Sequence, residues 1–423
     1  MWLRPPVAAA AAGPQQLAQC LRAAARFSAQ VCGFSKGARL RLRGSEALLQ
    51  KLLRDNGFKD LNANRSGQTA LHLAADSGVV EAAQALLARP DFRHADAQDL
   101  SGRTALHCAA QGHAADIRRA NAAKALLRHP RFTAVDGRDD EGWTALHFAV
   151  ARSSDGAGTA RAILRHARFT AVDAQEPSSA LPNGDEKEDT GRTALHVAAA
   201  NGHIEAAEAL LGHQRFEAAD VQDSAGRTAL HWAALRGHSC VVEALLRHPR
   251  FAAADHVDRS GSTAFSLAAA RGHAQVLCTL LDHPAFTAHD QADANGWTAL
   301  HVAAARGRRE AAAALLSHER FSSAGAIDAM GRTALHLAAA HGHGKVVETL
   351  LAHPRFAVVE HRDGEGRTAL HAAALKGRVS VLAALLRHPG LQRAREAQDS
   401  RGWTALHCAV VSSRLDVLEV FLE

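Results

Sequence analysis

A short string of residues, Thr-Ala-Leu-His or a near copy of it, recurs ten times along this chain. The copies begin at Thr69, Thr104, Thr144, Thr193, Thr228, Thr263, Thr298, Thr333, Thr368 and Thr404. Successive copies lie 35, 40, 49, 35, 35, 35, 35, 35 and 36 residues apart. Five consecutive identical spacings indicate a tandem array, in which each unit is one small motif packed against its neighbours.

The unit that begins at Thr228 indicates what each repeat encodes. The Thr228 hydroxyl suits the N-cap of a helix, and apolar residues at helical spacing follow it. Gly237 can adopt the left-handed conformation that ends this helix, and Pro249 ends a second one. An extended segment and an Asp-x-x-Gly turn then lead to the next Thr, so each unit is predicted to be helix, turn, helix and extended loop.

The full pattern, Asp-x-x-Gly-x-Thr-Ala-Leu-His-x-Ala-Ala-x-x-Gly-His, resembles the ankyrin repeat, whose signature Thr-Pro-Leu-His-x-Ala has a 33-residue period. The resemblance implies an all-α fold, an ankyrin-repeat solenoid of stacked helix-turn-helix units with finger loops. We expect an Arg-rich, acid-free extension at residues 1–44, a half-repeat cap at 45–66, and about ten repeats within 45–423. Ala replaces the Pro of the signature, and the two extra residues per period are placed in a His-Pro-Arg-Phe segment after the second helix.

One aromatic residue per repeat stands five residues after the second leucine of the second helix. This column is Phe58, Phe92, Phe132, Phe169, Phe216, Phe251, Phe286, Phe321 and Phe356, continued by Leu391. A set of side chains spread along a solenoid does not converge on one point, so we predict buried core positions rather than a cofactor site.

Most of the 27 histidines also fall into columns. In ankyrin-like repeats the histidine of Thr-Ala-Leu-His ties neighbouring units together by hydrogen bonds. Another column ends the second helix, where an imidazolium would suit the negative end of the helix dipole: His129, His166, His213, His248, His283, His318, His353 and His388. Because these residues are repeat positions and no zinc-binding motif occurs, we expect no metal and no cofactor.

Other function classes are excluded by what the sequence lacks. It contains no G-x-S-x-G elbow and no phosphate-binding loop, and the array leaves no room for a catalytic domain, so we expect no enzyme. Residues 1–45 hold seven Lys and Arg and no acid, which leaves 42 basic and 43 acidic residues in the rest. A neutral array argues against nucleic-acid binding, and no apolar run is long enough to span a membrane.

We therefore expect a scaffold or adaptor that binds a partner protein, and alternatively a regulatory subunit that inhibits or positions an enzyme. In ankyrin-like arrays the positions before Thr and before the inter-helix Gly face the ligand on the concave face. Before Thr stand Arg103, Trp143, Arg192, Arg227, Trp297, Arg332, Arg367 and Trp403. Before Gly stand Arg236, Arg271, Arg306 and Lys376. These residues favour a partner with acidic contact groups. We also expect the array to be monomeric.

The alternative interpretation is that each arginine before Thr pairs with the turn aspartate four residues earlier, as Arg227 with Asp223. Acidic residues at 139–141, with an acidic insertion at 174–190, make the fingers near repeats three and four negative, which predicts a bipolar surface. That insertion is interpreted as a solvated loop, or alternatively as an acidic recognition segment. Five further residues inserted between Ala110 and Leu126 are predicted to lengthen the turn between two helices.

The cysteines and the first 44 residues predict where the protein is located. Six cysteines without a regular framework fit free thiols in a reducing, intracellular compartment. The Arg-rich, acid-free residues 1–44 resemble a mitochondrial targeting segment, so a mitochondrial location is kept as the alternative to the cytoplasm.

Overall fold

A computed structural model describes residues 67–90, 92–112, 116–152, 157–176, 190–411 and 415–422. Over these residues the chain forms ten helix pairs, and the first helix of each pair begins directly after a repeat Thr. The first helices are α3 (Ala70–Asp76), α5 (Ala105–Gln111), α7 (Ala145–Ala151), α9 (Ala194–Asn201), α11 (Ala229–Arg236), α13 (Ala264–Arg271), α15 (Ala299–Ala305), α17 (Ala334–His341), α19 (Ala369–Leu375) and α21 (Ala405–Val411).

The second helices lie beside the first ones and are slightly longer. They are α4 (Val80–Ala88), α6 (Asp116–Arg128), α8 (Ala157–Leu164), α10 (Ile204–Leu211), α12 (Ser239–Arg247), α14 (Ala274–Asp282), α16 (Arg309–Ser317), α18 (Gly344–Ala352), α20 (Val379–Arg387) and α22 (Leu415–Leu422). Short 3-10 turns follow some of them: η2 (Ala218–Asp220), η3 (Ala288–Asp290), η4 (Ser323–Gly325), η5 (Pro389–Leu391) and η6 (Arg393–Arg395). The all-α ankyrin-repeat solenoid predicted from the repeat pattern is confirmed.

The start and end of a first helix follow from the residues the repeat supplies. Thr228 is extended (φ −88°, ψ 172°), and its hydroxyl accepts from the backbone N–H of His231. His231 in turn accepts the Thr228 backbone N–H at Nδ1 (3.2 Å), which makes a capping box with His in the place of Glu. Gly237 ends the helix at φ 84°, and a Cβ there would lie 2.6 Å from Nδ1 of His273 in the next repeat. Glycine is therefore required both by conformation and by space.

The core lies between the helices of each pair and under the loop that follows. Val241, Val242, Leu245 and Leu246 of α12 are buried against the first helices. The predicted aromatic column is buried at Phe92, Phe132, Phe169, Phe216, Phe251, Phe286, Phe321, Phe356 and Leu391. The core interpretation is thus confirmed for these positions, and Phe58 lies outside the described residues.

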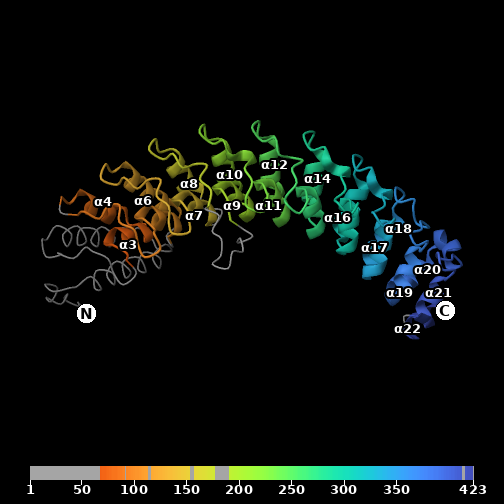
Figure 1. Cartoon of the computed structure of the whole chain (residues 1–423). Coiled ribbons are helices and arrows are strands. Elements are labelled where there is room, and N and C mark those ends of the chain that lie inside the picture. The colour runs from red at the N-terminus through yellow and green to blue at the C-terminus, as the bar shows by residue number, and fades with distance from the viewer. Residues whose placement is uncertain are drawn as a thin grey trace, which may run out of the picture. The chain divides into compact units, whose positions relative to one another are not determined.

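The chain divides into two compact units, one reaching Ala218 and the other running from Ala219, with Ala199–Gly202 grouped with the second. In the first unit α3, α5 and α7 pack in one row, and α4, α6, α8 and α10 pack in another. In the second unit the odd-numbered helices α11 to α21 form one row and the even-numbered helices α12 to α22 the other. Within each unit the finger loops project from one end of the helix pairs (Figure 1).

In five repeats the arginine of the His-Pro-Arg-Phe segment, or of its variants, ties the repeat to the preceding second helix. Arg320 donates to the carbonyls of Leu281, His283 and Phe286 at 2.5, 2.8 and 2.7 Å. These acceptors lie at and just after the end of α14, where helix carbonyls lack partners within the helix. Related contacts are made by Arg131, Arg168, Arg215 and Arg355. The lengthened loop is therefore a hydrogen-bonded connection, a role that the sequence analysis did not assign to this arginine.

A finger aspartate makes a second tie. Asp255 accepts the backbone N–H groups of Thr287 (2.9 Å) and Ala288 (3.0 Å), and also the Thr287 hydroxyl. The same arrangement, with a carboxylate accepting backbone donors of the next finger, occurs at Asp96, Asp136, Asp173, Asp220 and Asp290. Charge-assisted hydrogen bonds of this kind fix the spacing of adjacent loops.

The interrupted second repeat differs from what the sequence predicted. Helix α6 is 13 residues long, whereas α12 is nine, and both end at the same point of the repeat. Most of the five inserted residues therefore extend the second helix at its start, and the expectation that they only lengthen the turn is wrong. The extension at 1–44, the cap at 45–66 and residues 177–189 of the acidic insertion lie outside the described residues.

Candidate protein-binding surface

Each finger ends in a tight turn that positions the residue before the repeat Thr. In the turn at Asp328, Oδ1 accepts the backbone N–H groups of Met330 (2.9 Å) and Arg332 (2.8 Å). The backbone N–H of Asp328 donates back to the Arg332 carbonyl at 2.9 Å. Asp328 is buried, so its carboxylate is part of the frame, and Arg332 is held beside the first helix of the repeat.

Three of the arginines before Thr pair with the turn aspartate of their own repeat. Arg332 reaches Asp328 Oδ2 through Nε (2.8 Å) and Nη2 (2.7 Å), which is a two-pronged ion pair. The equivalent pairs are Arg103 with Asp99 and Arg367 with Asp363. Burial raises the pKa of the Asp328 carboxyl, but hydrogen bonds from Arg332 and the backbone outweigh it, and the pKa lies below its ordinary value.

Arg227 departs from the pairing expected for it. Its Nε lies 3.6 Å from Oδ2 of Asp258 in the next repeat. Oδ2 of Asp223, the expected partner, instead accepts the Trp232 indole N–H at 2.8 Å. The alternative interpretation, an Arg227–Asp223 pair, is therefore wrong for this arginine, whose ion pair is with Asp258.

The tryptophans before Thr are half-buried, and each has a different neighbour. Trp297 donates from Nε1 to Asp328 Oδ2 of the next repeat at 3.2 Å. The ring of Trp143 lies 5.1 Å from that of Phe148, and Arg401 lies 5.8 Å from the ring of Trp403. Arg192 is also half-buried, so all eight predicted residues before Thr share an intermediate exposure.

The histidines of Thr-Ala-Leu-His contact the backbone carbonyls of the residues before Thr in the next repeat. His301 Nε2 lies 3.1 Å from the Arg332 carbonyl of the next repeat, and His107 Nε2 lies 3.0 Å from the Trp143 carbonyl. The tie between neighbouring units that the ankyrin resemblance implied is thus confirmed. Burial lowers the pKa of His107 to about 4 and also lowers the pKa of His301, so both rings are neutral near pH 7.

The residues before the inter-helix Gly form a second row with a different environment. Arg236, Arg271, Arg306 and Lys376 are all exposed at the end of a first helix, where the helix dipole favours a cation. Within the described residues none of the four makes an ion pair or a side-chain hydrogen bond. The twelve predicted residues therefore divide into an anchored row before Thr and a free row before Gly.

The histidines that end the second helices close a local turn. The backbone N–H of Arg320 donates to His318 Nδ1 (3.3 Å), and His318 Nε2 lies 3.0 Å from Asp282 Oδ1 of the preceding repeat. The backbone contact occurs also at His129, His213, His283, His353 and His388. The sequence analysis did not predict this turn, and the imidazolium interpretation stays a prediction.

A basic groove in the first unit was not predicted. A cavity of about 490 Å³ between α6 and α8 is lined by Lys124, Arg128, Arg161 and Arg165. These four side chains are exposed, and none has an ion pair with a described residue. The groove could hold acidic groups, and the signal in the sequence was the lack of any acidic residue in α8.

Metal-binding and membrane-spanning features were sought over the same residues. No group of three or more His, Cys, Asp or Glu side chains is arranged to hold a metal among them. None of the helices described is both long and apolar enough to cross a membrane. Cys108 is buried, and burial raises the pKa of its thiol to about 12, which makes it unreactive.

Comparison with known proteins agrees with this geometry. The sequence profile for ankyrin repeats (3 copies) matches residues 38–120, 93–173, 113–218, 171–258, 215–290, 265–360 and 355–423. The chain therefore belongs to the ankyrin repeat family, whose repeats generally mediate protein–protein interaction. Among solved structures it is similar to the ankyrin repeat domain of Bcl-3, described as a unique member of the IkappaB protein family. The identity is 27%, the match covers 55% of this chain and 99% of that one, and the TM-score is 0.46. No curated protein matches the chain.

Proposed function

We propose that this protein is a scaffold or adaptor that binds an acidic segment of a partner protein and catalyses no reaction itself. The observation that carries the proposal is the free row: four exposed cations in register, each at the end of a first helix and none paired within the described residues. Charges left unpaired on a rigid frame are available to a ligand without breaking any internal contact.

The anchored row has a different part in this proposal. Five of its eight side chains are held by turn aspartates, so their conformations are fixed before a partner arrives: Arg103, Arg227, Trp297, Arg332 and Arg367. Preorganised aromatic and guanidinium groups lose little entropy on binding and are common anchors of protein interfaces. We propose that both rows contact the partner on the face of the first helices, the concave face in arrays of this family.

The experiment reverses charge on one face only. Arg236→Glu, Arg271→Glu and Arg306→Glu are combined in the full chain, and quantitative affinity capture is compared with the parent. The matched control is Arg309→Glu, Lys345→Glu and Arg387→Glu, three exposed cations of second helices in the same unit. Circular dichroism verifies that both variants fold.

We expect the face variant to lose the proteins that the parent captures, and the control to keep them. Equal capture by both variants, or equal loss from both, contradicts recognition through the free row. A regulatory subunit would use the same face. Assaying a captured enzyme with and without the array separates that alternative from a passive adaptor.

For location we propose the cytoplasm, with mitochondrial import through residues 1–44 as the alternative. Fusing residues 1–45 to a fluorescent reporter tests it, since a diffuse signal opposes import and a mitochondrial signal opposes the cytoplasm.

A further inference from the structure

Two side chains before Thr in the second unit reach forward to the turn of the next repeat, whereas Arg332 and Arg367 pair with the aspartate of their own turn. Arg227 reaches Asp258 Oδ2 (3.6 Å), and Trp297 reaches Asp328 Oδ2 (3.2 Å). Both contacts join a residue to the aspartate 31 positions later. The outer oxygen of a turn carboxylate thus has two sources of a donor: the residue before Thr of its own repeat, as Arg332 for Asp328, and that of the preceding repeat, as Arg227 for Asp258.

The repeat between these two makes no such forward contact. Its residue before Thr is Ser262, whose hydroxyl accepts from Ser260 Oγ (3.1 Å) and is too short to reach the next turn. The aspartate 31 positions later is Asp293, whose Oδ1 accepts the backbone N–H groups of Asn295 and Trp297, both at 2.8 Å. Among the described residues no side chain donates to Asp293 and no cation pairs with it.

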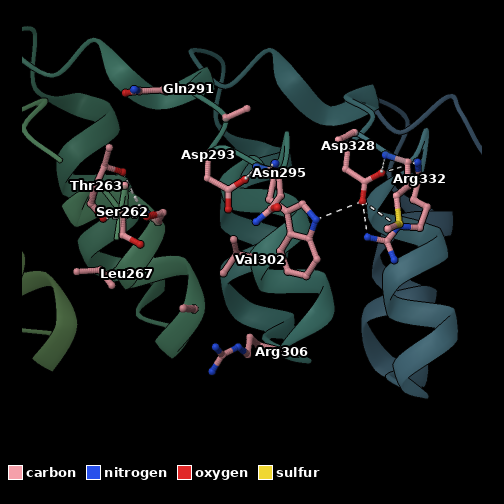
Figure 2. A pocket seen from close by; sticks show the side chains of 17 residues that line it. Ser262, Thr263, Leu267, Gln291, Asp293, Asn295, Val302, Arg306, Asp328 and Arg332 are labelled. Carbon is pink, nitrogen blue, oxygen red and sulfur yellow. Dashed lines mark hydrogen bonds and ion pairs between the residues drawn. The ribbon is translucent and has the colours of Figure 1, made fainter. Parts of the chain in front are cut away.

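A cavity of about 480 Å³ lies on the face of the first helices and is lined by Ser262 and Asp293 among others. Figure 2 shows its lining on three successive repeats: Ser262 and Leu267 on one side, Asp293 and Val302 in the middle, and Asp328 and Arg332 on the other side. Arg306 of the free row lies at the far end from Asp293 (Figure 2). The cavity is within the size range of ligand pockets. Its lining includes apolar Leu267 and Val302, the unpaired Asp293 carboxylate, and the Arg332–Asp328 ion pair.

We propose that this cavity binds an arginine side chain of the partner protein, which takes the place that the array's own arginine fills one repeat earlier. This rests on the proposed function. The template is Arg227, whose guanidinium lies 5.3 Å from the Trp232 ring and beside Asp258. Leu267 stands 35 positions after Trp232, and Asp293 stands 35 after Asp258.

The chemistry of the walls favours arginine over the alternatives. Its three-carbon stem would lie along Leu267 and Val302, while the planar guanidinium matches the Asp293 carboxylate. An acidic side chain would meet a like charge at Asp293. The Arg306 guanidinium at the far end suits an acidic residue next to that arginine, in agreement with the acidic segment proposed for the free row.

A peptide titration of the full chain tests the proposal without any knowledge of the partner. The probe is the capped peptide acetyl-Ala-Ala-Arg-Ala-Ala-amide, and the readout is the indole N–H resonance of Trp297, assigned with Trp297→Phe. The matched peptide carries citrulline, which has nearly the same shape but no charge. We expect saturable shifts with the arginine peptide and affinity weaker by about tenfold with citrulline, the cost of a lost charged hydrogen bond.

Two variants place the binding in the cavity. Ser262→Arg should fill it from within and abolish binding while the chain stays folded, since arginine occupies this position in other repeats. Asp293→Asn keeps an Oδ1 acceptor for the turn but removes the charge, and should weaken binding about tenfold. Asp258→Asn, the same change one repeat earlier at a paired carboxylate, should leave the peptide affinity unchanged.

Absence of a saturable shift, equal binding of the citrulline peptide, or unchanged binding to Ser262→Arg overturns the cavity proposal. None of these results depends on the charge-reversal capture experiment. If the face variant loses its partners while the peptide fails to bind, only the cavity proposal is contradicted. If capture is unaffected and the peptide binds, only the proposal that the free row recognises the partner is contradicted.

Discussion

Two rows of basic residues run along the second unit, and they differ in exposure and in ion pairing. The arginines of the anchored row are half-buried and paired with turn aspartates: Arg227, Arg332 and Arg367. The residues of the free row are exposed and unpaired within the described chain: Arg236, Arg271, Arg306 and Lys376. The difference teaches that position in the repeat, rather than residue type, decides whether an arginine holds the fold or is available to a ligand.

Backbone contacts sharpen the same contrast. The carbonyl of Arg332, in the anchored row, receives His301 Nε2 from the preceding repeat. The free row lies where a first helix ends and glycine turns the chain, for example at Arg236 before Gly237. Changes in the anchored row should therefore affect stability first, and changes in the free row should affect binding first.

The largest expected effect concerns the histidines that fix the anchored row in the first unit. Burial lowers the pKa of His107 and of His147 to about 4 from an ordinary 6.5. The stability from these neutral rings is complete above pH 6.5 and is lost as pH falls towards 4, because only the unfolded chain binds protons in that window. At pH 5 the two together should cost roughly 4 kcal/mol.

One buried carboxyl changes the free energy of unfolding in the opposite direction as pH falls, so it must be removed before the effect of the histidines can be measured. Burial raises the pKa of Glu176 to about 7, so its protonation stabilises the folded chain as pH falls from 7. Denaturant unfolding of Glu176→Gln at pH 7.5 and pH 5 therefore isolates the histidines. Equal unfolding free energies at the two values would contradict the neutral, buried rings.

Much of this frame could be predicted from the sequence, because the repeat signals are local. Thr at the N-cap, Gly at φ 84° and the column that includes Phe321 each act within one unit, and ten copies make the pattern unmistakable. The division of the twelve candidate residues into two rows could not be read in this way. Whether Arg227 pairs with Asp223 of its own turn or with Asp258 of the next one is settled only by packing between repeats, because both aspartates stand at the same position of their repeats.

Two further features have the same origin. The insertion before Leu126 extends α6, whereas counting residues gave only a longer turn. The turn at the end of α16, in which His318 Nδ1 accepts a backbone N–H, was not predicted either. In both cases the outcome depends on contacts that sequence spacing does not specify.

The next largest effect should come from the carboxylate on which the anchored row depends. Asp328 is buried and accepts two backbone N–H groups, the Arg332 guanidinium and the Trp297 indole. Asp328→Ala should lower the free energy of unfolding by about 3 kcal/mol, since it strands all of these donors. Denaturant unfolding measures the loss, with exposed Glu319→Ala as the control. A loss as small as that of the control would show that the turn does not need the carboxylate.

A smaller effect is expected when the cation of that pair is removed. Arg332→Met keeps the apolar stem but leaves Asp328 with its backbone and indole donors. The partly exposed guanidinium should contribute about 1 kcal/mol to the free energy of unfolding. If the variant unfolds at the same denaturant concentration as the parent, the ion pair is only incidental and the anchored row is no more structural than the free one.

The smallest effect is expected in the free row and decides how the two rows are interpreted. Arg306→Met removes an exposed guanidinium that pairs with no described residue, so it should change the free energy of unfolding by less than about 0.5 kcal/mol. What remains is the attraction of a cation to the end of α15, which salt screens. Unfolding is measured beside Arg332→Met at low and high salt, where the Arg306→Met difference should shrink and that of Arg332→Met should largely persist. A loss near 1 kcal/mol that salt does not reduce would make Arg306 a structural residue. Its exposed position would then not argue for a partner, because the residue would already be required by the fold.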